Sequence, residues 1–69
     1  MDRGAQAEIR EAIRKGSREA TKNGREICRY NFVFNRRWQG KQYRIKQVAP
    51  VIKEEANETI VITVYIFYF

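Results

Sequence analysis

Residues 59–69 read TIVITVYIFYF and form the longest apolar run in the chain. Successive side chains of a β-strand point to opposite faces. One face of this run carries Ile60, Ile62, Val64, Ile66 and Tyr68, and the other carries Val61, Thr63, Tyr65, Phe67 and Phe69. Because both faces are apolar, the run predicts a strand that is covered on both sides. We expect a helix to cover one face and a second copy of the chain to cover the other, with the dimer interface at Thr63, Tyr65, Phe67 and Phe69.

The N-terminal part predicts a helix over residues 5–15. One apolar stripe runs along it at helical spacing, formed by Ala5, Ile9, Ala12 and Ile13. Asp2 is the candidate N-cap, and Gly16 follows the helix as a typical ending residue. Residues 17–21 are interpreted as a short edge strand, with a frayed extension of the helix as the alternative. Asn23-Gly24 after them predicts a tight turn.

Two further alternating segments precede the apolar run. In residues 25–34 we expect Cys28, Tyr30, Phe32 and Phe34 to face the core. Residues 35–40 have the composition of a hairpin loop, and residues 41–49 alternate again. In the second segment Tyr43 and Ile45 share one face, and the other, outward face carries Arg44, Lys46 and Val48.

The remaining breaks complete the fold prediction. Pro50 has no N–H, so it predicts a bulge, an edge position or the end of regular pairing. Residues 54–58 read EEANE and predict a turn. The whole chain, residues 1–69, is therefore expected to be a single α+β domain, with one N-terminal helix packed on an antiparallel meander sheet of three to four strands.

Composition excludes several kinds of site. The chain has no histidine and one cysteine, Cys28, so a Ser-His-Asp triad, a tetrahedral zinc site and an intrachain disulfide are excluded. Glu54, Glu55 and Glu58 lack the ligand spacing of a calcium loop and are interpreted as a solvated turn. We expect no cofactor, no metal and an inert, buried Cys28. A lone thiol, no secretory signal and no membrane-spanning segment favour a cytoplasmic protein.

The charge is unevenly distributed. Residues 1–47 hold thirteen Lys and Arg against five Asp and Glu, whereas residues 48–69 hold Lys53 against three Glu. A basic front of this kind favours a polyanionic partner, either single-stranded RNA or an acidic protein. The alternative is that the charge only keeps a small domain soluble.

A basic and aromatic segment is the candidate nucleic-acid interface. Cations can neutralise phosphates, and a loop tryptophan can stack on an unpaired base. The candidate residues are Arg29, Arg36, Arg37, Trp38, Lys41, Arg44 and Lys46. The alternative is that Trp38 folds back over the core and that the cations only solvate the hairpin.

Four segments of the sequence resemble small domains related to the BrnT and RelE toxins. They are residues 9–16 (IREAIRKG), 25–30 (REICRY), 43–46 (YRIK) and above all 59–65 (TIVITVY). The resemblance implies a RelE-like fold and, for toxin members, cleavage of messenger RNA on the sheet surface by basic and tyrosine side chains. On that basis Arg29, Arg44 and Lys46 are candidates for phosphate contacts, and Tyr43 or Tyr65 for proton transfer.

The sequence departs from these domains because it begins at their second helix and lacks the preceding helix with its His and Arg signature. For this reason we expect no enzymatic activity. Together with the two apolar faces of residues 59–69, this favours a homodimer that binds RNA or a protein partner. One alternative is a toxin-type endoribonuclease of a toxin–antitoxin system, which would need no metal. Another is a purely structural or interaction protein.

Overall fold

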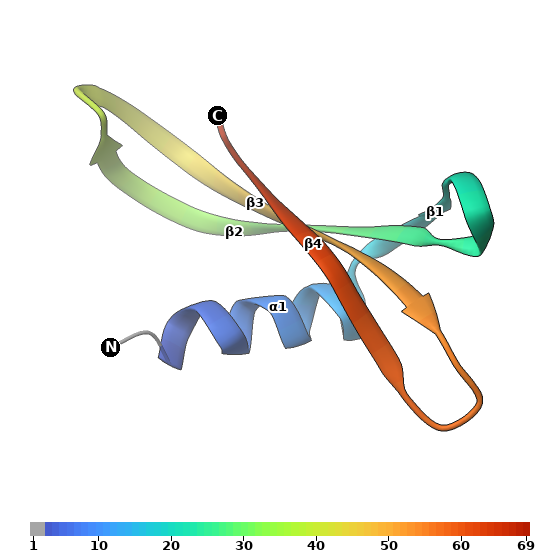
Figure 1. Cartoon of the computed structure of the whole chain (residues 1–69). Coiled ribbons are helices and arrows are strands. Elements are labelled where there is room, and N and C mark those ends of the chain that lie inside the picture. The colour runs from blue at the N-terminus through green and yellow to red at the C-terminus, as the bar shows by residue number, and fades with distance from the viewer. Residues whose placement is uncertain (1–2) are drawn as a thin grey trace.

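The computed structural model describes residues 3–69. Within them the chain forms one α-helix and four strands: α1 (Arg3–Lys15), β1 (Ser17–Ala20), β2 (Glu26–Trp38), β3 (Lys41–Glu54) and β4 (Thr59–Tyr68). The strands pair antiparallel in the order β1-β2-β3-β4, so each strand lies beside its neighbour in sequence (Figure 1). The predicted α+β class, with a helix on an antiparallel meander, is confirmed.

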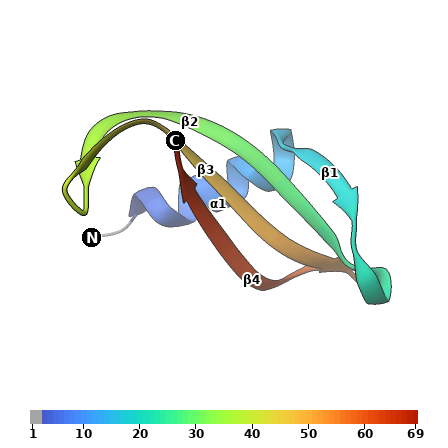
Figure 2. The same ribbon diagram turned by 90° about the horizontal axis from the view of Figure 1, so that it is seen from above.

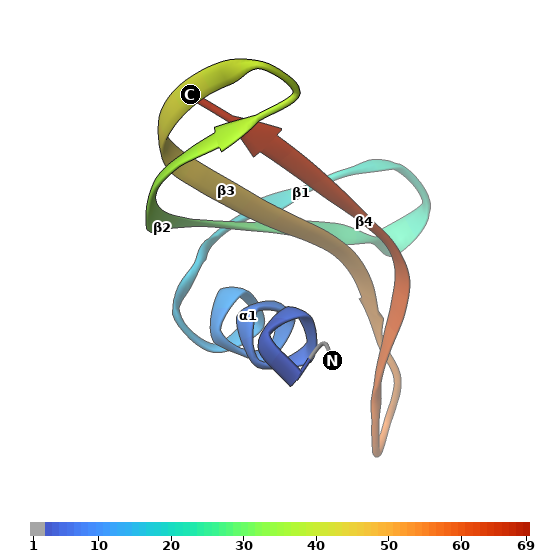
Figure 3. The ribbon, with the colours of Figure 1, turned by 90° about the vertical axis from the view of Figure 1, so that its left-hand side faces the viewer.

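α1 packs on one side of the sheet, against β2 and β3 (Figure 3). The helix ends at Gly16, whose N–H donates to the carbonyl oxygen of Ala12 at 2.8 Å. A Cβ atom at Gly16 would lie 2.5 Å from that oxygen and 2.6 Å from the carbonyl oxygen of Arg29, so only glycine fits between the helix end and β2. The expected N-cap, Asp2, lies outside the described residues. No helix in the described chain is long and apolar enough to cross a membrane.

The side of the sheet that carries α1 is called the helix face here. The β2–β3 register pairs Phe32 with Lys46, and Lys46 reaches Glu8 of α1, so this alternate set of residues points toward the helix. Its buried members are Cys28, Val48, Pro50 and Ile52, which form the core together with Ala12 of α1. The opposite side, called the open face, buries only Ile27 and Ala49 among its described residues.

This register corrects the expected orientation of β3. Lys46 and Val48 were expected to face outward, but Val48 is buried on the helix face and Lys46 lies on the same side. Ile45 pairs with Val33 on the open face. The prediction for β2 is confirmed for Cys28, which is fully buried. Its aromatic partners Tyr30, Phe32 and Phe34 are only partly buried.

The β2–β3 hairpin is longer than the sequence predicts. Residues 35–40 were expected to be a loop, but β2 continues to Trp38 and the turn consists of Gln39 and Gly40, with φ angles of 52° and 82°. The register shifts between Val33 and Arg36, where Asn35 adopts a φ of 48°. Asn35 is therefore an extra residue in a bulge of β2 and does not start a turn, so β2 and β3 continue to pair beyond it.

Pro50 does not end the regular pairing, which was one of the three alternatives expected for it. It lies inside β3 with a neighbouring strand on each side, opposite Val64 of β4. The β2–β3 pairing passes from Ile27–Val51 to Tyr30–Val48 and so skips Pro50. The missing N–H therefore falls in an interruption of the ladder, and the ring is buried on the helix face.

β4 is an edge strand, and most of its residues are exposed within the part of the chain that the structure describes. The expectation that the helix would cover one face of this strand is wrong, because α1 packs on β2 and β3. A helix is about 10 Å wide and strands are about 4.8 Å apart, so one helix covers about two strands. The exposed apolar residues of β4 are Ile60, Val61, Ile62, Tyr65, Ile66 and Phe67.

Candidate nucleic-acid interface

The β2–β3 hairpin carries a group of basic and aromatic side chains at its end. This group, called the basic hairpin end, consists of Arg36, Arg37, Trp38, Lys41 and Arg44. The strand register brings the two arms together, with Trp38 opposite Lys41 and Arg36 opposite Tyr43. The hairpin extends beyond the C-terminal end of β4 and lies at the opposite end of the sheet from the β3–β4 turn (Figures 1 and 2).

Aromatic rings hold the basic hairpin end against the last residues of β4. The ring of Trp38 stacks on that of Tyr68, with 5.1 Å between centroids and 27° between planes. Phe34 and Tyr43 also approach Tyr68, with centroid distances of 4.9 and 5.7 Å. The guanidinium carbon of Arg36 lies 5.0 Å from the centroid of Phe34, in cation–π geometry. The cluster fixes the direction of these side chains.

Trp38 is neither buried nor fully exposed. Its side chain packs on Tyr68, and 44% of the residue surface remains accessible. A depression of about 300 Å³ lies beside it, lined by Phe34, Arg36, Arg37, Trp38, Lys46 and Tyr68. An aromatic ring that is supported from one side and partly open on the other is suited to stacking on a planar ligand.

The cations of the basic hairpin end form no ion pair within residues 3–69. Among the described residues, Arg36, Arg37, Lys41 and Arg44 have no carboxylate within ion-pair distance. All four are exposed. Their positive charge is thus left uncompensated at one end of the molecule, where it attracts anions.

Arg29 and Lys46 do not belong to this group. Arg29 lies on the open face, where its Nε is 3.5 Å from Oε1 of Glu19 and its Nη1 donates to Oε1 of Gln47 at 3.2 Å. Lys46 lies on the helix face and pairs with Glu8. The expectation that these two cations share one outward face is wrong, because the register places them on opposite sides of the sheet.

Of the five candidates for catalysis, Lys46 lies on the helix face beside Glu8, and the other four fall into two groups. Arg29, Ala49 and Tyr65 lie in one cross-strand row on the open face, since the register aligns Arg29 with Ala49 and Ala49 with Tyr65. Tyr43 packs against Tyr68 at the hairpin, near the exposed Arg44. The five residues therefore do not converge on one site.

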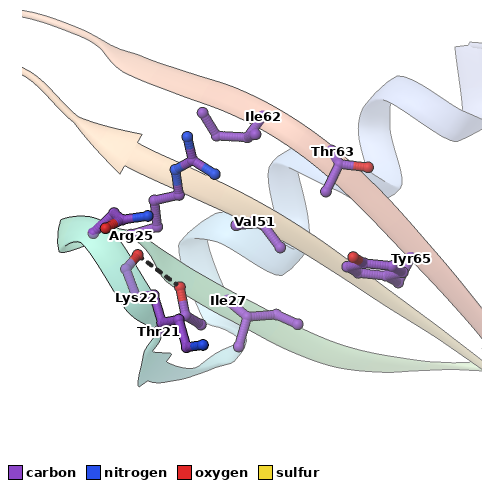
Figure 4. Close-up of a pocket in the computed structure, with 9 residues that line it drawn as sticks. Thr21, Lys22, Arg25, Ile27, Val51, Ile62, Thr63 and Tyr65 are labelled. Atoms are coloured by element: carbon purple, nitrogen blue, oxygen red, sulfur yellow. Dashed lines mark hydrogen bonds between the residues drawn. The ribbon is translucent and has the colours of Figure 1, made fainter.

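A second depression, of about 400 Å³, lies on the open face at the other end of the sheet (Figure 4). Ile27, Val51, Ile62 and Tyr65 supply its apolar and aromatic wall, and the side chain of Arg25 extends toward Ile62. Arg25 is not among the site residues that the sequence predicts. Arg25 follows the β1–β2 turn, where Asn23 and Gly24 adopt φ angles of 63° and 71°. The other wall of the depression comes from β4, which is distant in the sequence, so no local pattern predicts that the two segments meet.

Cys28 lies in the core between the sheet and the helix. The residue is fully buried, and burial raises the pKa of its thiol above the usual range. A thiol that keeps its proton is a poor nucleophile and metal ligand. Among the described residues, no group of three His, Cys, Asp or Glu side chains is placed to hold a metal ion.

Comparison of the chain with family models, with curated proteins and with solved structures finds no match.

Proposed function

We propose that this chain is a small RNA-binding module with a RelE-like fold, that it acts as a homodimer, and that it contacts single-stranded RNA through the basic hairpin end. The observation that carries the proposal is the combination of four exposed cations, which form no ion pair with the described residues, and a partly open tryptophan at one end of the hairpin. Phosphate attraction and base stacking are the two interactions that single-stranded nucleic acids offer to a protein without sequence recognition.

RNA is favoured over an acidic protein because of the aromatic component. Carboxylates would satisfy the arginines equally well, but they give no role to an aromatic ring that stands open beside them. A single-stranded nucleic acid supplies phosphates and planar bases together. The stacked arrangement of Trp38 on Tyr68 supports a base on the remaining ring surface.

The test is a titration of a labelled, unstructured RNA oligonucleotide followed by fluorescence anisotropy. Replacing both Arg36 and Arg37 by Ala is expected to raise Kd about tenfold or more and to reduce the salt slope by about 1.4. The matched control replaces Arg10 and Arg14 of α1, which are also exposed, and should leave Kd within about twofold. Equal loss in both variants would contradict a localised interface.

An acidic partner is the other outcome that this titration can identify. Poly-glutamate of the same charge as the oligonucleotide is added as a competitor. The proposal expects it to displace RNA poorly, because it offers no base for Trp38. Displacement at equal charge concentration would overturn the RNA assignment in favour of an acidic protein.

A second candidate is a metal-independent endoribonuclease related to the toxins, and the alignment of Arg29 with Tyr65 on the open face supports it. Arg29 of β2 and Tyr65 of β4 lie on either side of Ala49 of β3, so a phosphate bound between them would meet a guanidinium and a tyrosine hydroxyl, the groups that phosphate binding and proton transfer need. Its test is host toxicity on induced expression, with transcript cleavage that is lost in Tyr65→Phe and in Arg29→Ala. Overexpression that is harmless to the host and leaves transcripts intact would contradict the endoribonuclease and would favour the RNA-binding module.

A further inference from the structure

The two edges of the sheet differ in how well they are protected against pairing with another strand. β1 has four residues and carries Arg18 and Glu19, and short charged strands are poor templates for pairing. β4 has ten residues with neither charge nor proline, and its Ile66 and Phe67 are 41% and 40% exposed. A long apolar edge of this kind is rarely left free in natural sheets.

The last hydrogen bonds of β4 show which of its backbone groups are free. The N–H of Phe69 donates to the carbonyl oxygen of Ile45 at 3.0 Å, and the N–H of Ile45 donates to that of Phe69 at 3.2 Å. In an antiparallel pair such doubly bonded positions alternate with positions whose groups point away. The register runs without interruption from Lys46–Tyr68 to Pro50–Val64. The outward N–H and C=O groups therefore belong to Val64, Ile66 and Tyr68.

Opposite charges flank the two ends of this edge. At the start of β4 lies the acidic turn after β3, where Glu58 has no cation within ion-pair distance in the part of the chain that the structure describes. At the end of β4 lies Arg44 of β3, whose backbone N–H donates to the carbonyl oxygen of Phe69 at 2.8 Å. The side chain of Arg44 is exposed and, within the same described residues, unpaired.

We propose that two copies of the chain join edge to edge through β4, antiparallel, around a twofold axis near Val64 and Ile66. The inference rests on the homodimer of the proposed function and specifies its contact. Antiparallel pairing brings Glu58 of each copy level with Arg44 of the other, whereas parallel pairing would bring like charges together. Arg36 and Arg37 lie on β2, two strands from the contact, and stay accessible to RNA.

The first experiment is sedimentation equilibrium of the full chain, with folding checked by circular dichroism. Ile66→Pro removes an outward N–H that the single chain does not use, so it is expected to give a folded monomer. Ile66→Lys should act in the same way, because lysine protects an edge. The control is Val33→Lys on β2, which replaces an apolar residue that is 79% exposed and should leave the dimer intact.

The second experiment tests the orientation and does not depend on the proline variant folding. Arg44→Glu and Glu58→Lys are each expected to raise the dimer dissociation constant about tenfold, since two attractive rim pairs become repulsive. An equal mixture of the two variants should form a heterodimer of native affinity. One of its ion pairs is then the native one, and in the other pair the two charges have exchanged places but still attract.

The outcomes separate this inference from the proposed function. If Ile66→Pro and Ile66→Lys still form dimers, pairing through the β4 edge is contradicted but the homodimer is not. If Arg44→Glu and Glu58→Lys do not change the dimer dissociation constant, the antiparallel orientation is contradicted. A native chain that sediments as a monomer overturns the homodimer as well. RNA titration of the native chain and of the two Ile66 variants decides the RNA proposal by itself, since these samples retain every residue of the basic hairpin end.

Discussion

The ammonium group of Lys46 lies 2.9 Å from Oε1 of Glu8, which joins β3 to the helix packed on it. Both side chains are mostly shielded from solvent, with 22% and 28% of their surfaces exposed. The pair explains why Lys46 is unavailable as a surface cation. It also identifies the face of β3 on which α1 lies.

This ion pair is expected to stabilise the docking of α1. Glu8→Gln and Lys46→Met should each lower the free energy of unfolding, and a double-mutant cycle should give a coupling of about 1 kcal/mol, near the upper value for partly exposed pairs. Urea unfolding at low and high salt measures it. A coupling that is zero at low salt would contradict the packing of these two residues.

Gly16 is expected to tolerate no side chain. Gly16→Ala places a Cβ against two backbone oxygens, so we expect the free energy of unfolding to fall by about 2 kcal/mol or more. Gly4→Ala is the matched control: no atom lies within 4 Å of the added carbon, and a helical glycine is replaced by a better helix former. It should stabilise by about 0.5–1 kcal/mol. Equal effects of the two substitutions would contradict the close approach of α1 to β2.

The buried thiol of Cys28 makes stability depend on alkaline pH. Its pKa is raised by burial in the folded chain, so above about pH 8.5 the unfolded thiol loses its proton while the folded thiol keeps it. The free energy of unfolding should therefore decrease from pH 7 to pH 9. Cys28→Ala should show a smaller decrease over the same range. Rapid reaction of native Cys28 with a thiol reagent would show that the residue is accessible.

Trp38 is expected to contribute to RNA affinity through stacking. Trp38→Leu keeps an apolar side chain on Tyr68 but removes the ring, and we expect a loss of about 1–3 kcal/mol in binding a single-stranded oligonucleotide. Trp38→Phe should retain part of that affinity. If the Trp38→Leu and Trp38→Phe variants bind the oligonucleotide equally well, the aromatic ring serves only the packing of the hairpin.

The sequence pattern predicted the secondary structure better than the relative positions of the elements. The helix before Gly16, the Asn23-Gly24 turn and the final strand are local signals, and all three are present. Which face of β3 meets the helix depends on strand register, which was not visible in the alternation of residues 41–49 alone.

The part of the candidate site that lies within one hairpin was predicted, and the part that depends on other elements was not. Arg36, Arg37, Trp38, Lys41 and Arg44 are close in sequence, and a hairpin necessarily brings them together. Arg29 and Lys46 were grouped with them because both alternate with apolar residues. Their actual partners, Glu19 and Glu8, come from β1 and α1, so only the assembled fold reveals them.

The most direct test of RNA binding uses the fluorescence of Trp38, the sole tryptophan of the chain. Single-stranded RNA is titrated into the protein at 50 mM and 200 mM salt. We expect saturable quenching, with an affinity that falls about 20-fold between the two conditions if three phosphates are neutralised by Arg36, Arg37 and Lys41. Emission from Trp38 that does not change, or an affinity that is the same at both salt concentrations, would contradict the account.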